Sequence, residues 1–422
     1  MPGALNPGPE EDPFAWPRRW WLAAMFLSVF GGGMVALANA YIVYDQTHSV
    51  SITGLIAVCS SLPPLVLPAA ATALAQRFGG PRIYIARYIA STIVGFAPVV
   101  LSAAGHLTAA ALLIWCAATS VIAGLTSPAG SLVQRMLAPP ALLPEFNAAA
   151  ARNHALATVL GILAGGAVFA AVGASWIYAI NAISYLPLIF PVIALLGHNV
   201  PAEASRQRFR NVLSLLYGPN ARLDLRAIAS FTTLSLAIGG FTVALPAIAR
   251  GVGNSANVLS LLQAAAAVGG VATATAIRLL HQRVGWGRVQ RGCFCMTGLG
   301  VGLLAWSTHP GPGPALSLVI AIAAILPVGF ALTLDQTILT ALAQMWTPPQ
   351  SRAVFFTFYA LIPMVAIPVG QEVIGLLADL LSVSAALAVV AVLALVLVAI
   401  GPYLPMRAAF DAMSRAEEPP RL

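Results

Sequence analysis

The sequence predicts an all-α integral membrane protein with twelve transmembrane helices, arranged as two pseudo-symmetric six-helix bundles. Hydrophobic residues make up 59% of the 422 residues and charged residues only 8%, and the mean hydropathy is +0.88. An average soluble protein carries roughly 25% charged residues. The apolar runs extend from Trp20 to about Leu404, and one twelfth of that length, about 32 residues, suffices for a spanning helix and a short loop. Two pairs of loop motifs also recur at nearly the same spacing, which indicates an internal repeat.

The individual helices follow from the apolar runs, whose limits are set by Gly, Pro and charged residues. Each run is long enough to cross the hydrocarbon core, which takes ~20 residues. The first six helices are predicted at 19–44, 50–75, 82–104, 107–136, 147–171 and 175–197. The second six are predicted at 226–249, 255–280, 289–308, 315–345, 352–378 and 382–404.

The remaining segments are more polar. Residues 1–18 are rich in Pro and acidic residues and are expected to form a disordered cytosolic tail, with a second cytosolic tail at 405–422. Residues 198–225 are expected to form a cytosolic linker. This division leaves 19–197 as the N-terminal six-helix bundle and 226–404 as the C-terminal one.

The basic residues predict the orientation of these helices. All 21 are Arg, and with the N-terminus in the cytosol 20 of them lie in cytosolic segments, whereas only Arg250 lies outside. Cytoplasmic loops of membrane proteins retain positive charge. We therefore expect a multi-pass protein of a bacterial inner membrane with both termini in the cytosol.

The loop motifs define the repeat. The segment LAQRFGGPR (Leu74–Arg82) after the second helix matches LHQRVGWGR (Leu280–Arg288) after the eighth, at an offset of 206 residues. The segment MLAPP (Met136–Pro140) matches MWTPP (Met345–Pro349) at an offset of 209. Two landmarks at nearly one offset indicate a parallel six-helix repeat, which resembles the arrangement of major facilitator transporters.

The first of these loops resembles the signature between helices two and three of that superfamily, G-x-L-a-D-R-x-G-R-[KR]. The resemblance implies a loop that holds the cytosolic side closed through charge pairs. Gln76 occupies the acidic position, so the latch is expected to be weaker, and a loop that is merely basic is the alternative. The candidate gating residues are Gln76, Arg77, Gly79 and Arg82, with Gln282, Arg283, Gly285 and Arg288 in the second half.

A second resemblance lies in helices five and six. The segment from Pro144 to Ile189 resembles the macrolide-efflux and enterobactin-exporter branch of the superfamily, whose members include drug:proton antiporters, and the resemblance implies export. Ile162 replaces the Pro of the antiporter signature, so this motif alone does not establish antiport. The spacing of Gly161 and Gly165 permits close helix packing in lipid. The helix-five motif comprises Arg152, Asn153, Gly161, Gly165 and Gly166.

The same resemblance implies a substrate cavity, because helices one, four, seven and ten line the central cavity in this superfamily. Thr and Gln share one face of helix ten at about 100° per residue. These polar side chains either line the cavity or form hydrogen bonds between helices, and Trp115 either contacts substrate or packs. The candidate cavity residues are Asn39, Trp115, Thr119, Thr126, Thr333, Gln336, Thr337 and Thr340.

Two carboxyl groups lie inside apolar runs, where an ionisable group is costly and calls for a function. Asp335 lies in helix ten, roughly opposite the Thr and Gln face, and Glu372 lies in helix eleven. Reversible protonation during transport is the functional interpretation. A fixed ion pair, with Arg352 as a partner for Asp335, or a hydrogen-bonded carboxyl is the alternative.

The composition disfavours other classes of protein. The four Cys lie in apolar runs, the six His are scattered, and no phosphate-binding loop with Lys is present. We expect no enzymatic activity, no cofactor, no metal site and, despite the net charge of +8, no nucleic-acid partner. The expected partners are a small-molecule substrate, protons and the lipid bilayer, and the chain is expected to be a monomer.

These observations predict a proton-coupled exporter of a small amphipathic or drug-like molecule that works by alternating access. A proton-coupled importer or facilitator on the same fold is the first alternative. A membrane receptor or scaffold that transports nothing is the second.

Overall fold

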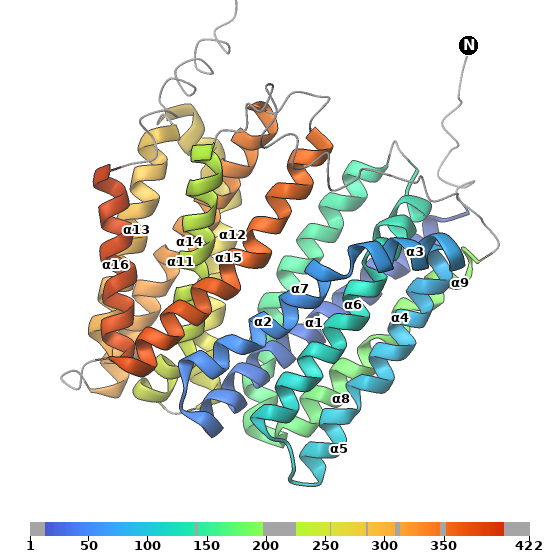
Figure 1. The fold of residues 1–422 in the computed structure, drawn as a ribbon, viewed down its shortest axis with the longest axis horizontal. Coiled ribbons are helices and arrows are strands. Elements are labelled where there is room, and N and C mark those ends of the chain that lie inside the picture. The colour runs from blue at the N-terminus through green and yellow to red at the C-terminus, as the bar shows by residue number, and fades with distance from the viewer. Residues whose placement is uncertain are drawn as a thin grey trace, which may run out of the picture. The chain divides into compact units, whose positions relative to one another are not determined.

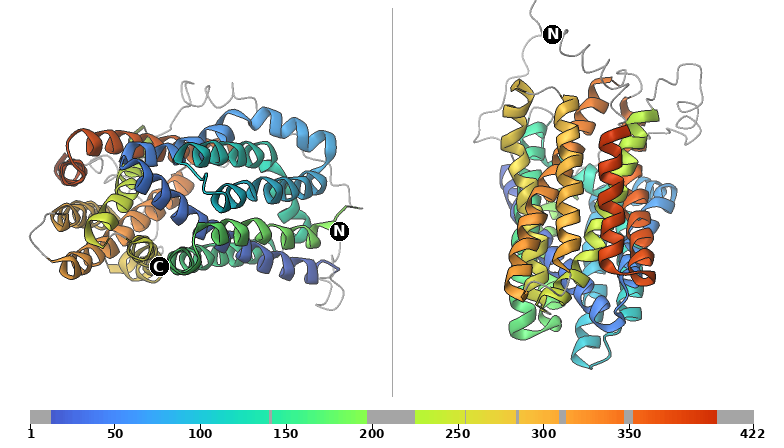
Figure 2. Two further views of the ribbon diagram at one scale, coloured as in Figure 1. Left: turned by 90° about the horizontal axis from the view of Figure 1, so that it is seen from below. Right: turned by 90° about the vertical axis from the view of Figure 1, so that its left-hand side faces the viewer.

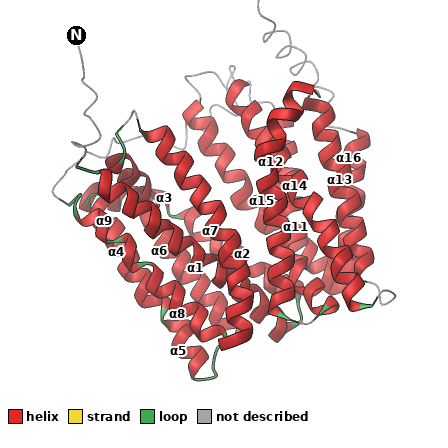
Figure 3. Cartoon of the chain, turned by 180° about the vertical axis from the view of Figure 1, so that it is seen from behind, coloured by secondary structure: helices red, strands yellow, loops and turns green. Residues whose placement is uncertain are grey.

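The first half of the chain folds into helices joined by short turns. The computed structural model describes residues 13–139, 142–196, 225–253, 255–283, 286–308, 313–346 and 352–400, and within these ranges there is no strand (Figure 3). The elements before residue 197 are α1 (Ala15–Thr47), α2 (Val50–Val66), α3 (Pro68–Phe78), α4 (Gly80–Gly95), α5 (Ala97–Ala103), α6 (Ala109–Leu137), α7 (Leu143–Val172), α8 (Ala174–Ser184), the 3₁₀ turn η1 (Leu186–Leu188) and α9 (Phe190–Ile193) (Figure 1).

The second half consists of six long helices. Their bounds are α11 (Leu225–Val252), α12 (Ala256–Arg283), α13 (Trp286–Ser307), α14 (Pro314–Trp346), α15 (Arg352–Leu380) and α16 (Val383–Ile400). Among the described residues nine spans are long and apolar enough to cross a membrane, or ten if the bent pair α2 and α3 is one span. Each of the twelve predicted spans coincides with one helix or with consecutive short helices, so the all-helical membrane fold is confirmed.

Three of the predicted helices are broken, and a proline follows each break. The second span bends by 58° between α2 and α3, where Pro68 begins α3. The third span is interrupted at Phe96, just before Pro98, and the sixth at the 3₁₀ turn that contains Pro187. Proline has no N–H to donate and its ring clashes with the preceding turn. The prediction of one continuous helix was therefore wrong for the second span, whereas Gly80–Ala103 and Ala174–Ile193 each still form one apolar span despite the local interruption.

The chain forms two compact units. The first comprises residues up to Asn39 and residues 62–204, and the second comprises residues 40–61 and the chain from Ser205 onward. The end of α1 and most of α2 therefore pack with the helices that follow residue 205. Within the second unit α11 packs on α15, and α14 packs on both α12 and α13 (Figure 2). Most of the predicted linker 198–225 lies outside the described residues, so the predicted domain limits stay predictions.

An aromatic cluster fills one end of the first unit. Trp21, Tyr84 and Phe146 are buried there together with Leu188. The Trp21 indole N–H donates to the Tyr84 hydroxyl at 2.7 Å, and its ring centroid lies 5.3 Å from that of Phe146. Because buried aromatic side chains with a polar atom need a hydrogen-bond partner, this cluster joins α1 and α4 with no unpaired donor on the indole.

The same close helix contact occurs in both units and confirms the repeat. A Cβ atom on Gly161 would come within 2.2 Å of the Phe30 carbonyl oxygen, and one on Gly370 within 2.2 Å of the Leu236 carbonyl oxygen. Phe30 and Leu236 are 206 residues apart, and the two glycines are 209 residues apart. These are the two offsets of the loop motifs, so α1 packs on α7 in the same way as α11 packs on α15.

The close contact predicts that Gly161→Ala and Gly370→Ala destabilise the protein. A methyl group has no room at either position, and overpacking of this kind costs about 1–3 kcal/mol. We expect a lower melting temperature of the purified protein, followed by intrinsic fluorescence. Gly130→Ala is the matched control, because nothing lies within 4 Å of a Cβ atom there and Ala favours the helix. Equal melting temperatures for Gly161→Ala and Gly130→Ala would contradict the packing argument.

Candidate functional site

The tip turn, which we define as residues 45–51, joins α1 to α2 within the second unit. Only two residues separate the helices. His48 adopts a left-handed backbone conformation with φ of 52°, which a few non-glycine residues tolerate. Ser49 then caps α2, because its Oγ accepts a hydrogen bond from the Ile52 N–H at 3.0 Å. The chain therefore reverses direction in a short turn whose polar groups are largely bonded.

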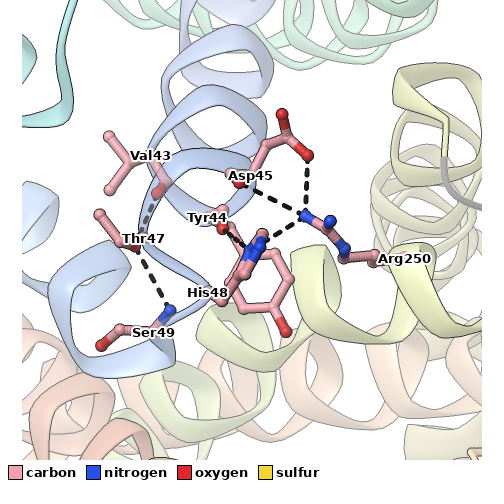
Figure 4. A network of polar contacts seen from close by, with 7 residues as sticks. All are labelled: Val43, Tyr44, Asp45, Thr47, His48, Ser49 and Arg250. Atoms are coloured by element: carbon pink, nitrogen blue, oxygen red, sulfur yellow. Dashed lines mark hydrogen bonds and ion pairs between the residues drawn. The ribbon is translucent and has the colours of Figure 1, made fainter.

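Arg250 of α11 binds the first half of the tip turn (Figure 4). Its NH1 donates to Asp45 Oδ1 at 2.8 Å, to the Asp45 carbonyl oxygen at 3.4 Å and to His48 Nδ1 at 3.1 Å. The guanidinium can only donate, so this contact requires the His48 tautomer whose Nδ1 carries no hydrogen. A cation at the end of α1 also complements the helix dipole. Half of the Asp45 side chain is exposed, so water screens the ion pair, which contributes at most about 1 kcal/mol.

Asp379 of α15 binds the second half of the tip turn. Its Oδ2 accepts from Ser49 Oγ at 2.6 Å and from the Ser51 N–H at 3.1 Å, and its Oδ1 accepts from the Val50 N–H at 2.8 Å. Val50 and Ser51 are the first residues of α2, whose N–H groups have no partner within the helix. The carboxylate of one helix therefore caps the N-terminus of another.

Glu372 lies on the same face of α15, seven residues before Asp379. Its Oε2 accepts from Ser51 Oγ at 3.1 Å, whereas its Oε1 is buried and has no hydrogen-bond partner. A Cβ atom on Gly54 would lie 3.3 Å from this Oε1, so α2 passes directly over the carboxyl group. Glu372 thus lies inside a membrane span with one oxygen bonded and one uncompensated.

Asp335 lies between α13 and α14 and is 1% exposed. Gln290 of α13 is close to it and is fully buried, and Cys293 lies near by. No well-formed hydrogen bond joins them, because both Asp335 oxygens and both Gln290 amide atoms lack a partner. Buried polar atoms without partners are uncommon and need an explanation. Asp335 therefore faces the neighbouring helix α13, whereas the side chain of Arg352, its partner in the alternative interpretation, lies outside the described residues.

An apolar cavity of about 260 Å³ lies one turn from this pair, between α11 and α13–α16. Phe294 lies four residues after Gln290 on α13, and Leu332 lies three residues before Asp335 on α14, and both line the cavity. Its remaining lining is apolar except for two Thr side chains.

Comparison with known proteins identifies the family. The family model described as transmembrane secretion effector matches residues 13–421. The chain belongs to this family of the major facilitator superfamily. Comparison with curated proteins gives no match.

Solved structures with the same fold are transporters. A crystal structure of a mutant of the nucleoside transporter NupG is similar over 94% of this chain and 99% of that chain, with a TM-score of 0.70 and 12% identity. An inward-facing crystal structure of a bacterial homologue of the iron transporter ferroportin is similar over 92% of this chain and 98% of that chain, with a TM-score of 0.71 and 15% identity. At these identities the likeness shows the fold alone.

In the transporter the candidate cavity residues of α14 differ in their exposure. Thr337 is exposed, and Thr333, Gln336 and Thr340 are half-buried. Thr333 lies against α12, since a Cβ atom on Gly270 would come within 2.7 Å of its hydroxyl oxygen. The hydroxyls of Thr337 and Thr340 bond to carbonyls one turn earlier in the same helix. The Thr and Gln face of α14 is therefore not uniformly exposed, because Thr333 packs against α12.

The four candidate cavity residues of the first half all lie in the first unit. Asn39 accepts from the Tyr178 hydroxyl at 2.7 Å and donates weakly to Cys116 Sγ at 3.5 Å. Trp115 is buried against Tyr178 and donates to the Val94 carbonyl oxygen at 2.9 Å. Both side chains therefore contact neighbouring helices of the first unit. The hydroxyls of Thr119 and Thr126 bond to carbonyls of α6 itself, and a role in cargo binding stays a prediction for all four.

The candidate gating residues of the first loop are at the surface. Gln76, Arg77 and Arg82 are exposed, and the Arg77 guanidinium lies 5.2 Å from the Phe78 ring centroid. Gly79 has φ of 82°, a conformation that favours glycine. In the second loop Arg288 is exposed, the side chains of Gln282 and Arg283 are not described, and Gly285 lies outside the described residues.

The glycines of the helix-five motif allow close helix packing. Gly161 and Gly165 meet α1, where Cβ atoms would come within 3 Å of the Phe30 and Met34 backbone, and Gly166 is buried. Asn153 Nδ2 donates to the Leu22 carbonyl oxygen at 3.5 Å. Arg152 is exposed, so its role stays a prediction.

Sequence reasoning assigned no role in these sites to four of their residues, Arg250, Asp45, Asp379 and Gln290. Arg250 and Asp45 carry opposite charges directly after two predicted spans, and Asp379 lies two helical turns after Glu372. The opposite charges and the spacing from Glu372 could both have been recognised in the sequence. Gln290 gave no signal, because an uncharged amide in an apolar run is not unusual.

The buried contact between Tyr178 and Asn39 gives a prediction that separates packing from cargo binding. Tyr178→Phe removes the hydroxyl donor and leaves Asn39 Oδ1 unpaired, at a cost of about 1–3 kcal/mol. We expect a lower melting temperature and an unchanged range of transported dyes. Trp176→Phe, at an exposed position of the same helix, is the control and should change neither. A changed dye range at an unchanged melting temperature would instead place Asn39 in the cargo site.

Proposed function

We propose that the transporter is a proton-coupled exporter of a small amphipathic molecule and works by alternating access. The observation that carries the proposal is the Glu372 carboxyl, which lies in a membrane span with one buried oxygen that has no partner. A charged group without a partner is costly in this environment, and its neutral form is much less so.

The surroundings of Glu372 favour coupling over a fixed structural role. A fixed carboxylate is expected to have a cationic or fully bonded partner, but Glu372 has a single hydroxyl donor, Ser51, and the backbone of Gly54. Both neighbours belong to α2. Movement of α2 therefore changes the environment of the carboxyl group, and by reciprocity the proton on the carboxyl group changes the position of α2.

Asp335 is a second candidate for proton binding. Its complete burial beside Gln290, without hydrogen bonds on either side chain, disfavours a permanently ionised carboxylate. Proton entry supplies about 2.3 kcal/mol per charge per 100 mV from the electrical gradient alone. Both carboxyl groups lie in the second unit, so we place proton binding there.

The cargo and the direction of transport rest on the family and on the sequence. The family description refers to secretion, and the resemblance to drug exporters favours an amphipathic molecule. The exposed Thr337, within the Thr and Gln face of α14, is the described polar surface we assign to cargo. We place the protein in a bacterial inner membrane, and the distribution of Arg supports cytosolic termini, which makes export an outward movement.

Glu372→Gln tests the coupling. The amide keeps the size and polarity of the side chain but cannot exchange a proton, so proton-driven transport should fall at least tenfold (one order of magnitude, about 1.4 kcal/mol) while cargo binding remains. Accumulation of the fluorescent amphipathic cation ethidium in inverted vesicles provides the measurement, because an exporter moves its cargo into their lumen. Glu145→Gln, at an exposed carboxylate of α7, is the control. An unchanged dependence on the proton gradient would remove Glu372 from the mechanism.

The same vesicles test the direction. Accumulation of ethidium when the vesicle lumen is acidified supports export, whereas no accumulation together with uptake by whole cells supports an importer. Single Cys substitutions at Thr119 and Thr337 test the third possibility. Labelling of neither position from either side of the membrane would favour a receptor or scaffold.

A further inference from the structure

We propose that Asp379 is a positioning residue that holds the N-terminus of α2 against Glu372 and so sets the pH at which α2 leaves α15. The inference rests on the proposed proton exchange at Glu372. Asp379 contacts neither cargo nor the exchanged proton in this scheme, and it acts through the first turn of α2.

The surfaces of α2 and α15 fit together without a gap. Glu372, Gly375 and Asp379 follow a spacing of three and four residues, which places them on one face of α15. A Cβ atom on Gly375 would come within 2.7 Å of Ser51 Cα. The backbone of α2 therefore rests directly on α15 between the two carboxyl groups, and a small displacement of α2 changes both contacts.

The three hydrogen bonds of Asp379 all end in the first turn of α2 or in its capping residue. Two are backbone N–H groups that a helix cannot satisfy internally, and an anion at a helix N-terminus is stabilised by the helix dipole. Hydrogen bonds to an ionised acceptor are also stronger than neutral ones. Because all three bonds must break before α2 leaves α15, Asp379 contributes docking energy while it is ionised.

Glu372 has the opposite requirement. Its Oε1 has no donor, so an ionised Glu372 opposes docking, and the negative charge of Asp379 on the same helix adds to that opposition. A neutral Glu372 removes both penalties. Docking of α2 is therefore strongest when Asp379 is ionised and Glu372 is protonated, and it weakens as the pH rises and Glu372 loses its proton.

The other titratable and charged groups near these carboxyls leave this scheme intact. Cys59 of α2 lies within electrostatic reach of Glu372, and Tyr44 of α1 lies within reach of Asp379 and Arg250. Arg250 of α11 is bonded to Asp45. None of them bonds to the Oε1 of Glu372. The pH dependence of α2 docking on α15 therefore depends on the two carboxyl groups of α15.

Hydrogen exchange tests the proposal directly, because two of the bonded groups are backbone amides. The full-length protein in lipid nanodiscs is measured by mass spectrometry across a pH series, and the exchange of residues 49–56 is divided by that of an unstructured peptide at each pH. The pH profile of ethidium transport is measured in parallel. The variants are Asp379→Asn, Asp379→Glu, Glu372→Gln and the control Glu145→Gln.

We expect Asp379→Asn to weaken docking roughly three- to tenfold, between the values for an exposed ion pair and a helix-capping anion. The pH at which residues 49–56 lose half of their protection should fall by about half a unit to one unit. Docking requires a proton on Glu372, so if docking is tenfold weaker, a tenfold higher proton concentration is needed to keep half of the molecules docked. Asp379→Glu should restore part of the protection, and Glu145→Gln should behave as the unmodified protein.

The outcomes separate this inference from the proposed function. If Asp379→Asn leaves both the protection and the pH profile unchanged, or lowers transport equally at every pH, Asp379 has no positioning role. If Glu372→Gln keeps the pH dependence of the protection, proton exchange at Glu372 is wrong, even where Asp379→Asn still weakens docking at every pH. Protection that is independent of pH in Glu372→Gln, together with the shifted midpoint in Asp379→Asn, supports both.

Discussion

The candidate site depends on charged side chains that bind two helix ends at the tip turn. A helix end presents unsatisfied groups and a partial charge, positive at the N-terminus and negative at the C-terminus. Here Arg250 meets the end of α1 and Asp379 meets the start of α2. The two charges thereby fix the first turns of α2 on α15, and this contact places Ser51 and Gly54 over Glu372. The capping of α2 therefore helps to keep Ser51 and Gly54 in a defined position over Glu372.

The repeat supplies the packing but not the charges. At the offset of 209 residues the counterparts of Glu372, Gly375 and Asp379 are Leu163, Gly166 and Ala170. The small residue is kept at the point of close approach, whereas both carboxyl groups have apolar counterparts. Close contact between helices in lipid depends on small residues, which explains why both halves retain them. Ionisable groups in a membrane span are costly, so their restriction to one half indicates that the two halves have different roles in the proposed transport cycle.

Much of the fold could be predicted because lipid leaves the chain few alternatives. Apolar runs gave the positions of the spans, since every backbone group must be bonded within a helix there. The breaks at Pro68 and Pro98 escaped prediction, because prolines inside α6 and α15 interrupt no helix and the sequence alone does not distinguish the two cases. Glu372 and Asp335 stood out as carboxyl groups in apolar surroundings, but their neighbours Gly54 and Gln290 did not. Those contacts join helices far apart in sequence through uncharged groups, which leave no pattern to detect.

The two buried carboxyl groups differ in what surrounds them, and this difference bears on their roles. Asp335 is enclosed between α13 and α14, which pack closely within one unit, and its neighbour Gln290 is equally enclosed. Glu372 is only partly buried, and its neighbours belong to the short segment 40–61 of the first sequence half. A proton site can drive a conformational change only if its proton affinity differs between the two conformations. The contacts of Glu372 are lost when α2 moves, whereas those of Asp335 do not involve α2. Glu372 is therefore the better placed of the two to link proton binding to movement, and Asp335 fits a site that holds a proton within the second unit.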